Sequence, residues 1–125
     1  MVSFDRAFVA FGLAWLNMGM ILGLYIGITS ANQFIPVHVT MMLPGFAVLT
    51  LYGLIYRSWP ELNESRLGHL QFWLATIAVL GQVFGALQFA LSGGIEVTLI
   101  AAASGLAIIA GLLLAVLFLT QTEGA

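Results

Sequence analysis

Two histidines are the side chains of this chain best suited to metal or haem chemistry, and only one of them lies within an apolar run. His38 stands in the stretch Pro36-Val37-His38-Val39-Thr40, at the start of the run 37–56. A neutral imidazole binds iron or another metal through a ring nitrogen lone pair. Because an ionisable side chain within a membrane is costly unless a partner holds it, His38 is a candidate functional residue.

The helical face that carries His38 has unusual neighbours. Side chains three, four and seven positions apart share a face, so His38 shares one with Met41, Met42 and Gly45. Gly45 would leave a flat gap beside the imidazole, and such a gap suits a planar macrocycle. Pro44 should kink the helix there, because proline removes a helical hydrogen bond and clashes with an earlier carbonyl. The plainer interpretation is an ordinary hydrogen bond from His38 at the membrane interface.

The second histidine, His69, cannot join His38 at one iron within one subunit. It follows the far end of the same helix, about 30 Å away at 1.5 Å per residue. If a haem is bound, its second axial ligand would be His38 of a neighbouring copy, Met41, Met42, water or nothing. Gln88 is predicted at a depth similar to that of His38 and could orient the imidazole, although a packing contact fits it equally well.

Composition identifies the elements that must position these residues. The chain has 125 residues, of which 62% are hydrophobic and only 6% charged, whereas soluble domains carry about 25% charged residues. A transmembrane helix needs about 20 apolar residues. Such runs lie at 7–28, 37–56, 70–91 and 97–119. We therefore predict an all-α integral membrane protein, with residues 1–125 forming a single four-helix transmembrane bundle.

The few charges predict how the bundle is oriented. Arg6, Arg57 and Arg66 are the only Lys or Arg residues, and four crossings put all three on one side. By the positive-inside rule both termini lie in the cytoplasm, and His38 lies near the outer face of a bacterial cytoplasmic membrane. So few basic residues argue against a nucleic-acid partner. The lipid bilayer is the first partner expected.

Small residues at a spacing of four predict close helix packing, either within one chain or between copies in a dimer or trimer. Such residues are Gly19, Gly23 and Gly27, then Gly81 and Gly85, then Ala101, Gly105, Ala107, Gly111 and Ala115. Asn17 and Gln82 are both near mid-depth, so we expect a hydrogen bond between them. Together with Gln88, these two residues are also the basis of an alternative hypothesis, a small oligomeric channel.

One part of the chain resembles a known family. Its residues are Pro36-Val37-His38, Leu54-Ile55-Tyr56-Arg57-Ser58-Trp59-Pro60 and Gln71-Phe72-Trp73-Leu74. They resemble the second helix, the loop and the third-helix start of heme–copper oxidase catalytic subunits, above all the nitric oxide reductase branch. In that family a second-helix His near the outer face is an axial ligand of the low-spin haem, and His38 matches its position. The resemblance implies one four-helix arc of a twelve-helix subunit, with His38 as ligand to a b-type haem iron.

The departures from that family limit the expected activity. Its copper-binding histidines lie in later helices and have no counterpart here. Some small relatives carry His-x-His where this chain has His38-Val39-Thr40. We therefore expect a haem protein for electron transfer, or for gas or redox sensing, without copper and without oxygen reduction by itself. The alternative is a cofactor-free structural or assembly subunit of a respiratory complex.

Overall fold

The computed structural model describes residues 3–92 and 97–121, and almost all of them are helical. The elements follow one another as α1 (Phe4–Thr29), the 3-10 turn η1 (Asn32–Phe34), α2 (Ile35–Thr40), the π-helical segment η2 (Met41–Val48), α3 (Leu49–Ser58), the 3-10 turn η3 (Pro60–Glu64), α4 (Arg66–Ser92) and α5 (Val97–Gln121). α2, η2 and α3 form one continuous rod. The prediction of an all-α chain is confirmed for the described residues.

Four helical stretches are long and apolar enough to cross a membrane. They are Phe4–Thr29, Asn32–Ser58, Arg66–Ser92 and Leu99–Gln121. Each matches one predicted run, but the first three begin three to five residues before the apolar run does. Charged residues such as Asp5 and Arg66 lie within these extensions, because a helical backbone continues past the point where the side chains become polar.

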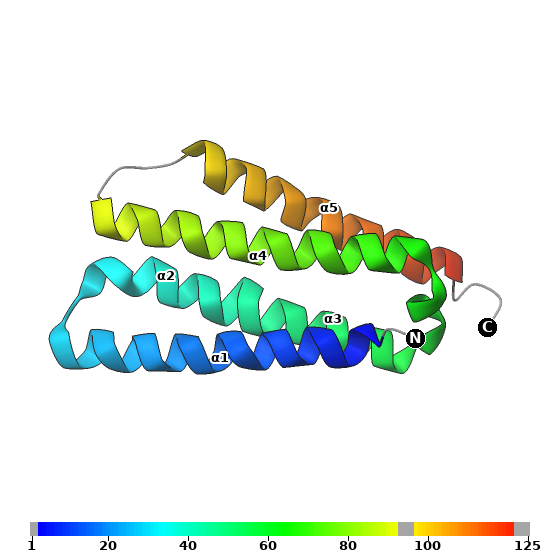
Figure 1. Ribbon diagram of the computed structural model, residues 1–125, viewed down its shortest axis with the longest axis horizontal. Helices are drawn as coiled ribbons and strands as arrows, with labels where there is room; N and C mark the ends of the chain where they lie inside the picture. The colour runs from blue at the N-terminus through cyan, green and yellow to red at the C-terminus, as the bar shows by residue number, and fades with distance from the viewer. Residues whose placement is uncertain (1–2, 93–96, 122–125) are drawn as a thin grey trace.

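The helices are arranged in two layers (Figure 1). α1 packs against the rod of α2, η2 and α3, and α4 packs against α5. The described chain begins and ends at the same end of the bundle, where η3 also lies. We call this the arginine end, after Arg6, Arg57 and Arg66, and we call the opposite end, at η1 and α2, the His38 end.

The tightest part of the core lies at the arginine end. Phe8 and Tyr56 are 0% exposed and stack with their ring centroids 5.6 Å apart. Phe72 meets Phe8 edge to face at 4.9 Å, and Phe4 lies 5.4 Å from Phe72. Aromatic pairs at such distances contribute about 0.5–1.5 kcal/mol beyond their buried area. These rings join α1, α3 and α4 at this end.

The irregularity expected at Pro44 takes the form of the π-helical segment η2. In an α-helix the Pro44 ring would clash with the carbonyl of Thr40, and its missing N–H would leave one acceptor without a donor. The wider π turn relieves that clash. Thus η2 keeps α2 and α3 in one rod across the proline.

Candidate functional site at the His38 end

His38 is fixed against α1 by one hydrogen bond. Its Nδ1 lies 2.7 Å from the carbonyl oxygen of Gly19. Since a carbonyl oxygen only accepts, Nδ1 must carry the hydrogen and donate it. In the neutral ring the other nitrogen, Nε2, then keeps its lone pair and is the atom available to a metal.

Glycines on α1 make room for the imidazole. A Cβ atom at Gly23 would lie 2.9 Å from Cε1 of His38, and one at Gly19 would lie 2.6 Å from Sδ of Met42. A larger side chain at Gly23 would displace the imidazole, and one at Gly19 would displace the Met42 side chain. Gly27 differs, because a Cβ there would have nothing within 4 Å. Gly19 and Gly23 therefore allow close packing within the chain, whereas the surface at Gly27 is open.

The other residues predicted to share the face of His38 also turn toward α1. Met42 and Met41 both pack on Gly19, and Gly45 is buried against Trp15. A Cβ at Gly45 would lie 2.8 Å from the Trp15 ring. The flat gap expected over Gly45 is therefore filled by the indole.

Gln88 and His69 stand away from this arrangement. Gln88 is exposed on α4, and among the described residues no hydrogen bond joins its side chain to His38. His69 lies at the arginine end, where its ring meets Phe4 edge to face at 4.7 Å. The two histidines are thus at opposite ends of the bundle, as their spacing predicted.

An apolar groove of about 440 Å³ runs beside His38, between α1, α2 and α4. Its lining includes Met18, Tyr25, Phe34, Val37, Met41 and Leu87. Val37 is the chain neighbour of His38 and Met41 lies one turn further along. His38 itself is not among the lining residues, because it faces the middle of α1, and the groove lies to one side.

These observations test whether the chain fits a haem. His38 is suited to be the iron ligand. A metal-bound His usually donates a hydrogen bond from its other ring N–H to a carbonyl or carboxylate, as Nδ1 does here to the Gly19 carbonyl. The space within one chain does not fit, because Trp15 fills the position over Gly45. His38 is half-buried, and the edge of its ring lies against α1, where a Cβ of Gly23 would stand 2.9 Å from Cε1 and 3.5 Å from Nε2. A planar group bound at Nε2 would therefore lie beside Gly23.

The hydrogen bond predicted between Asn17 and Gln82 does not form. Asn17 is exposed and its Nδ2 donates to the Leu13 carbonyl of its own helix, at 2.9 Å. The side-chain oxygen of Gln82 is buried without a hydrogen-bond partner among the described residues. That prediction was wrong because similar depth in the membrane does not place two residues on facing sides of their helices.

A buried polar pair that the sequence analysis did not single out joins three helices. The Tyr56 hydroxyl donates to Oε1 of Gln71 at 3.0 Å, and Nε2 of Gln71 donates to the Ala110 carbonyl at 3.3 Å. Gln71 is 0% exposed. The rule that polar groups inside a membrane need partners could have pointed to Gln71. In the sequence analysis Gln71 was named only as part of the motif Gln71-Phe72-Trp73-Leu74.

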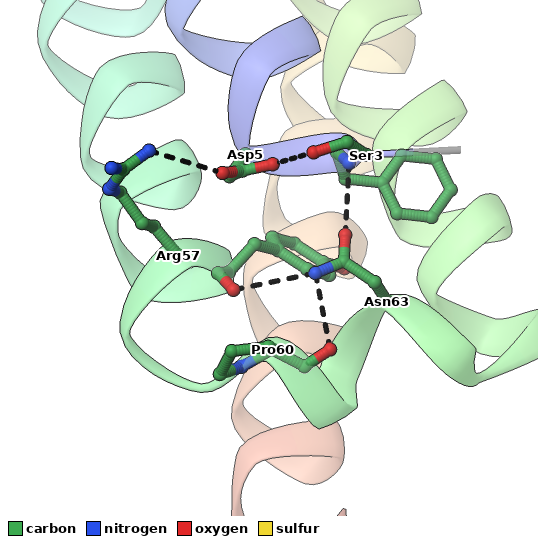
Figure 2. Close-up of polar contacts among 7 residues, drawn as sticks. Ser3, Asp5, Arg57, Pro60 and Asn63 are labelled. Atoms are coloured by element: carbon green, nitrogen blue, oxygen red, sulfur yellow. Dashed lines mark hydrogen bonds and ion pairs between the residues drawn. The ribbon is translucent and has the colours of Figure 1, made fainter. Parts of the chain in front are cut away.

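A second polar cluster closes the arginine end (Figure 2). Oδ1 of Asn63 accepts from the Phe4 N–H at 2.9 Å, and its Nδ2 donates to the Pro60 carbonyl at 3.2 Å. Asp5 forms an ion pair with Arg57 at 3.6 Å and also accepts from the Ser3 hydroxyl. Asn63 thereby satisfies a free N–H at the start of α1, as N-terminal capping requires. The cluster ties α1 to η3 and is structural.

Comparison of the chain with protein-family models, with curated proteins and with solved structures finds no match. Function therefore has to be inferred from the residues of the chain. Among the described residues no three His, Cys, Asp or Glu side chains gather into a group that could hold a metal ion. His38 is thus the residue on which a cofactor hypothesis depends.

Proposed function

We propose that this chain is a multi-pass protein of a bacterial cytoplasmic membrane that binds a b-type haem through Nε2 of His38. Its role would be electron transfer, or the sensing of a diatomic gas or of redox state. The observation that carries the proposal is the hydrogen bond from Nδ1 of His38 to the Gly19 carbonyl. In the neutral ring this bond puts the hydrogen on Nδ1 and the lone pair on Nε2, and it holds the ring in one orientation, as an axial ligand requires.

The orientation in the membrane follows from the charges. Four apolar spans bring Arg6, Arg57 and Arg66 to one end of the bundle. The positive-inside rule places that end, and with it both termini, in the cytoplasm. His38 then lies near the outer face. The resemblance to heme–copper oxidases also implies a haem ligand at that face.

A haem at His38 would be shared between copies of the chain. Trp15 fills the space over Gly45, so one chain alone offers no slot there for the macrocycle. A neighbouring copy in a dimer or trimer would supply the rest of the site, and a trimer would repeat the three-arc arrangement of the resembled family. A bound haem supplies an iron that exchanges one electron and binds diatomic gases. The chain's own contribution is the proton held at Nδ1 and an apolar surround that excludes water.

The test is the absorption spectrum of the purified protein after expression with ample haem. His69→Ala is a matched control, because it removes the only other histidine and lies at the opposite end of the bundle. We expect a Soret band in the wild type and in His69→Ala, and its loss in His38→Ala. A colourless wild type, or a Soret band that survives His38→Ala, would contradict the proposal.

A second candidate function is a cofactor-free structural or assembly subunit of a respiratory complex. The contact of Trp15 with Gly45 favours it, because that contact is the dry packing expected where no cofactor lies. In this case the hydrogen bond of His38 would serve only to hold α2 against α1. Colourless protein that copurifies with a larger complex, and loses it on His38→Ala but not on His69→Ala, would support this function. The small oligomeric channel stays an untested alternative, with Asn17 and Gln88 both exposed on the bundle.

A further inference from the structure

Asn17 carries an amide at the middle of a membrane-spanning helix. α1 runs from Phe4 to Thr29, and each of its ends is about 20 Å from Asn17 at 1.5 Å per residue. The hydrocarbon core of a bilayer is about 30 Å thick, so this amide lies near its midplane. The Asn side chain is too short to reach the headgroups from there. Its hydrogen-bond partners must therefore lie inside the membrane.

The chain itself leaves most of this amide unpaired. Nδ2 donates one hydrogen bond to the Leu13 carbonyl of the same helix, at 2.9 Å. Within residues 3–92 and 97–121, no group donates to Oδ1 of Asn17, and the second N–H of Nδ2 has no acceptor. Lipid tails neither donate nor accept, so an unpaired polar group among them is strongly unfavourable. A partner from outside the chain is therefore expected.

The other exposed Asn and Gln side chains of the described residues are placed differently. Gln88 stands four residues before the end of α4, and the rest lie at the ends of helices. Water and lipid headgroups can satisfy amides at those depths. Across the described chain, Asn17 is thus the one exposed amide at mid-depth.

Asn17 lies on the side of α1 that turns away from the rest of the bundle. α1 packs mainly on the rod of α2, η2 and α3, and Gly19 is buried on that side. The residues that share the opposite face with Asn17 at helical spacing are all exposed, namely Ala10, Leu13, Ala14, Ile21 and Leu24. The two alanines leave room for the backbone of another helix to come close to the amide.

We infer that this face of α1 is a dimer interface with α1 of a second copy of the chain, in which the two Asn17 amides hydrogen-bond to each other. Copies inserted in the same orientation carry Asn17 at the same depth, and a two-fold axis along the membrane normal brings the same face of each together. An amide has both donors and an acceptor, so each supplies what the other lacks. The inference requires membrane insertion but not haem, because His38 bonds to Gly19 on the other side of α1.

The first test is disulfide crosslinking in the membranes of expressing cells, with iodine as the oxidant. The chain has no cysteine, so a single introduced one can pair only with its counterpart in another copy. Ala14→Cys lies on the face of Asn17, and Ala47→Cys is its matched control, an exposed alanine of η2 at a similar depth. A disulfide requires Cα atoms within about 7 Å. We therefore expect Ala14→Cys to become mostly dimeric and Ala47→Cys to stay monomeric.

The second test measures the contribution of Asn17 by energy transfer between copies labelled at the C-terminus, in liposomes of increasing lipid content. Asn17→Leu removes the amide at an exposed position, so the fold of the single chain should be retained. We expect it to raise the dissociation constant of the dimer about tenfold. Gln88→Leu is the control, an exposed amide near a helix end, and should leave the constant unchanged.

A monomeric wild type would overturn the inference, and so would equal crosslinking of Ala14→Cys and Ala47→Cys. An Asn17→Leu variant that dimerises as tightly as the wild type would overturn the role of the amide. Colourless protein that still dimerises through this face would contradict the haem proposal and leave this inference standing.

Discussion

The two ends of the bundle are built differently. At the arginine end, buried aromatic rings and the polar contacts of Asn63 and Gln71 join α1, α3, η3, α4 and α5. At the His38 end, the bond of His38 to Gly19 is the one side-chain hydrogen bond between helices within the described residues. We infer that the arginine end holds the fold and that the His38 end is free to bind a partner or cofactor.

The largest effect should come from filling a close backbone contact between α1 and α3 near the arginine end. A Cβ at Gly53 would lie 2.9 Å from the backbone oxygen of Asp5 and 3.1 Å from Cβ of Phe8. Because backbone cannot move aside as a side-chain tip can, Gly53→Leu should destabilise the bundle by about 3 kcal/mol. Unfolding in detergent measures this loss.

Gly27→Leu is the matched change at the His38 end, where a Cβ meets nothing within 4 Å. It should leave the unfolding free energy unchanged within about 0.5 kcal/mol. Equal losses in the two variants would refute the difference between the ends.

The next largest effect should come from the buried polar pair. Gln71→Leu leaves the Tyr56 hydroxyl without its acceptor in a dry core, which costs about 1–3 kcal/mol. Gln88→Leu, at an exposed position, should be neutral. The same unfolding assay compares the two, and a stable Gln71→Leu would show that the pair contributes nothing.

Removing the imidazole from the haem-free protein should have a smaller effect. Hydrogen bonds between membrane helices contribute about 0.6 kcal/mol on average. His38→Ala should therefore lower the unfolding free energy of haem-free protein by about 0.5–1 kcal/mol. A loss above about 3 kcal/mol would make His38 a main support of the fold, contrary to the proposed division between the ends.

The smallest effect should come from the surface ion pair. Arg57 is 74% exposed where it meets Asp5 at 3.6 Å. Because water and salt screen such pairs, Arg57→Gln should change stability by less than about 0.5 kcal/mol, and less still at high salt. Unfolding at two salt concentrations tests this, and a large salt-dependent loss would contradict it.

The fold could be predicted from the sequence because apolar length alone specifies a membrane helix. The predicted run 70–91 lies within α4, which spans Arg66–Ser92. The predicted and observed boundaries of this helix differ because the side chains become polar before the helical backbone stops. Pro44 marked the irregular stretch correctly, but a kink and a π-helix relieve the same clash, and the sequence does not distinguish them.

The site was harder to predict, because a helix that is apolar on every side does not reveal which face meets its neighbour. The shared face of His38, Met42 and Gly45 follows from helical geometry and is found against α1. That Trp15 would fill the gap at Gly45 depends on the rotation of α1 about its axis. The sequence does not give the rotation of each helix about its axis, and for the same reason the predicted hydrogen bond between Asn17 and Gln82 was wrong.

The central claim is that Nδ1 of His38 carries the proton, so that the lone pair of Nε2 is available to bind iron. Nitrogen-15 NMR of labelled histidine in the membrane-embedded protein tests it most directly, with His69 as the internal control. We predict a protonated Nδ1 and an unprotonated Nε2 for His38, and an Nε2 signal that shifts or broadens away when haem is added while the His69 signals stay unchanged. A protonated Nε2, or a His38 spectrum that haem leaves unaltered, would contradict the account.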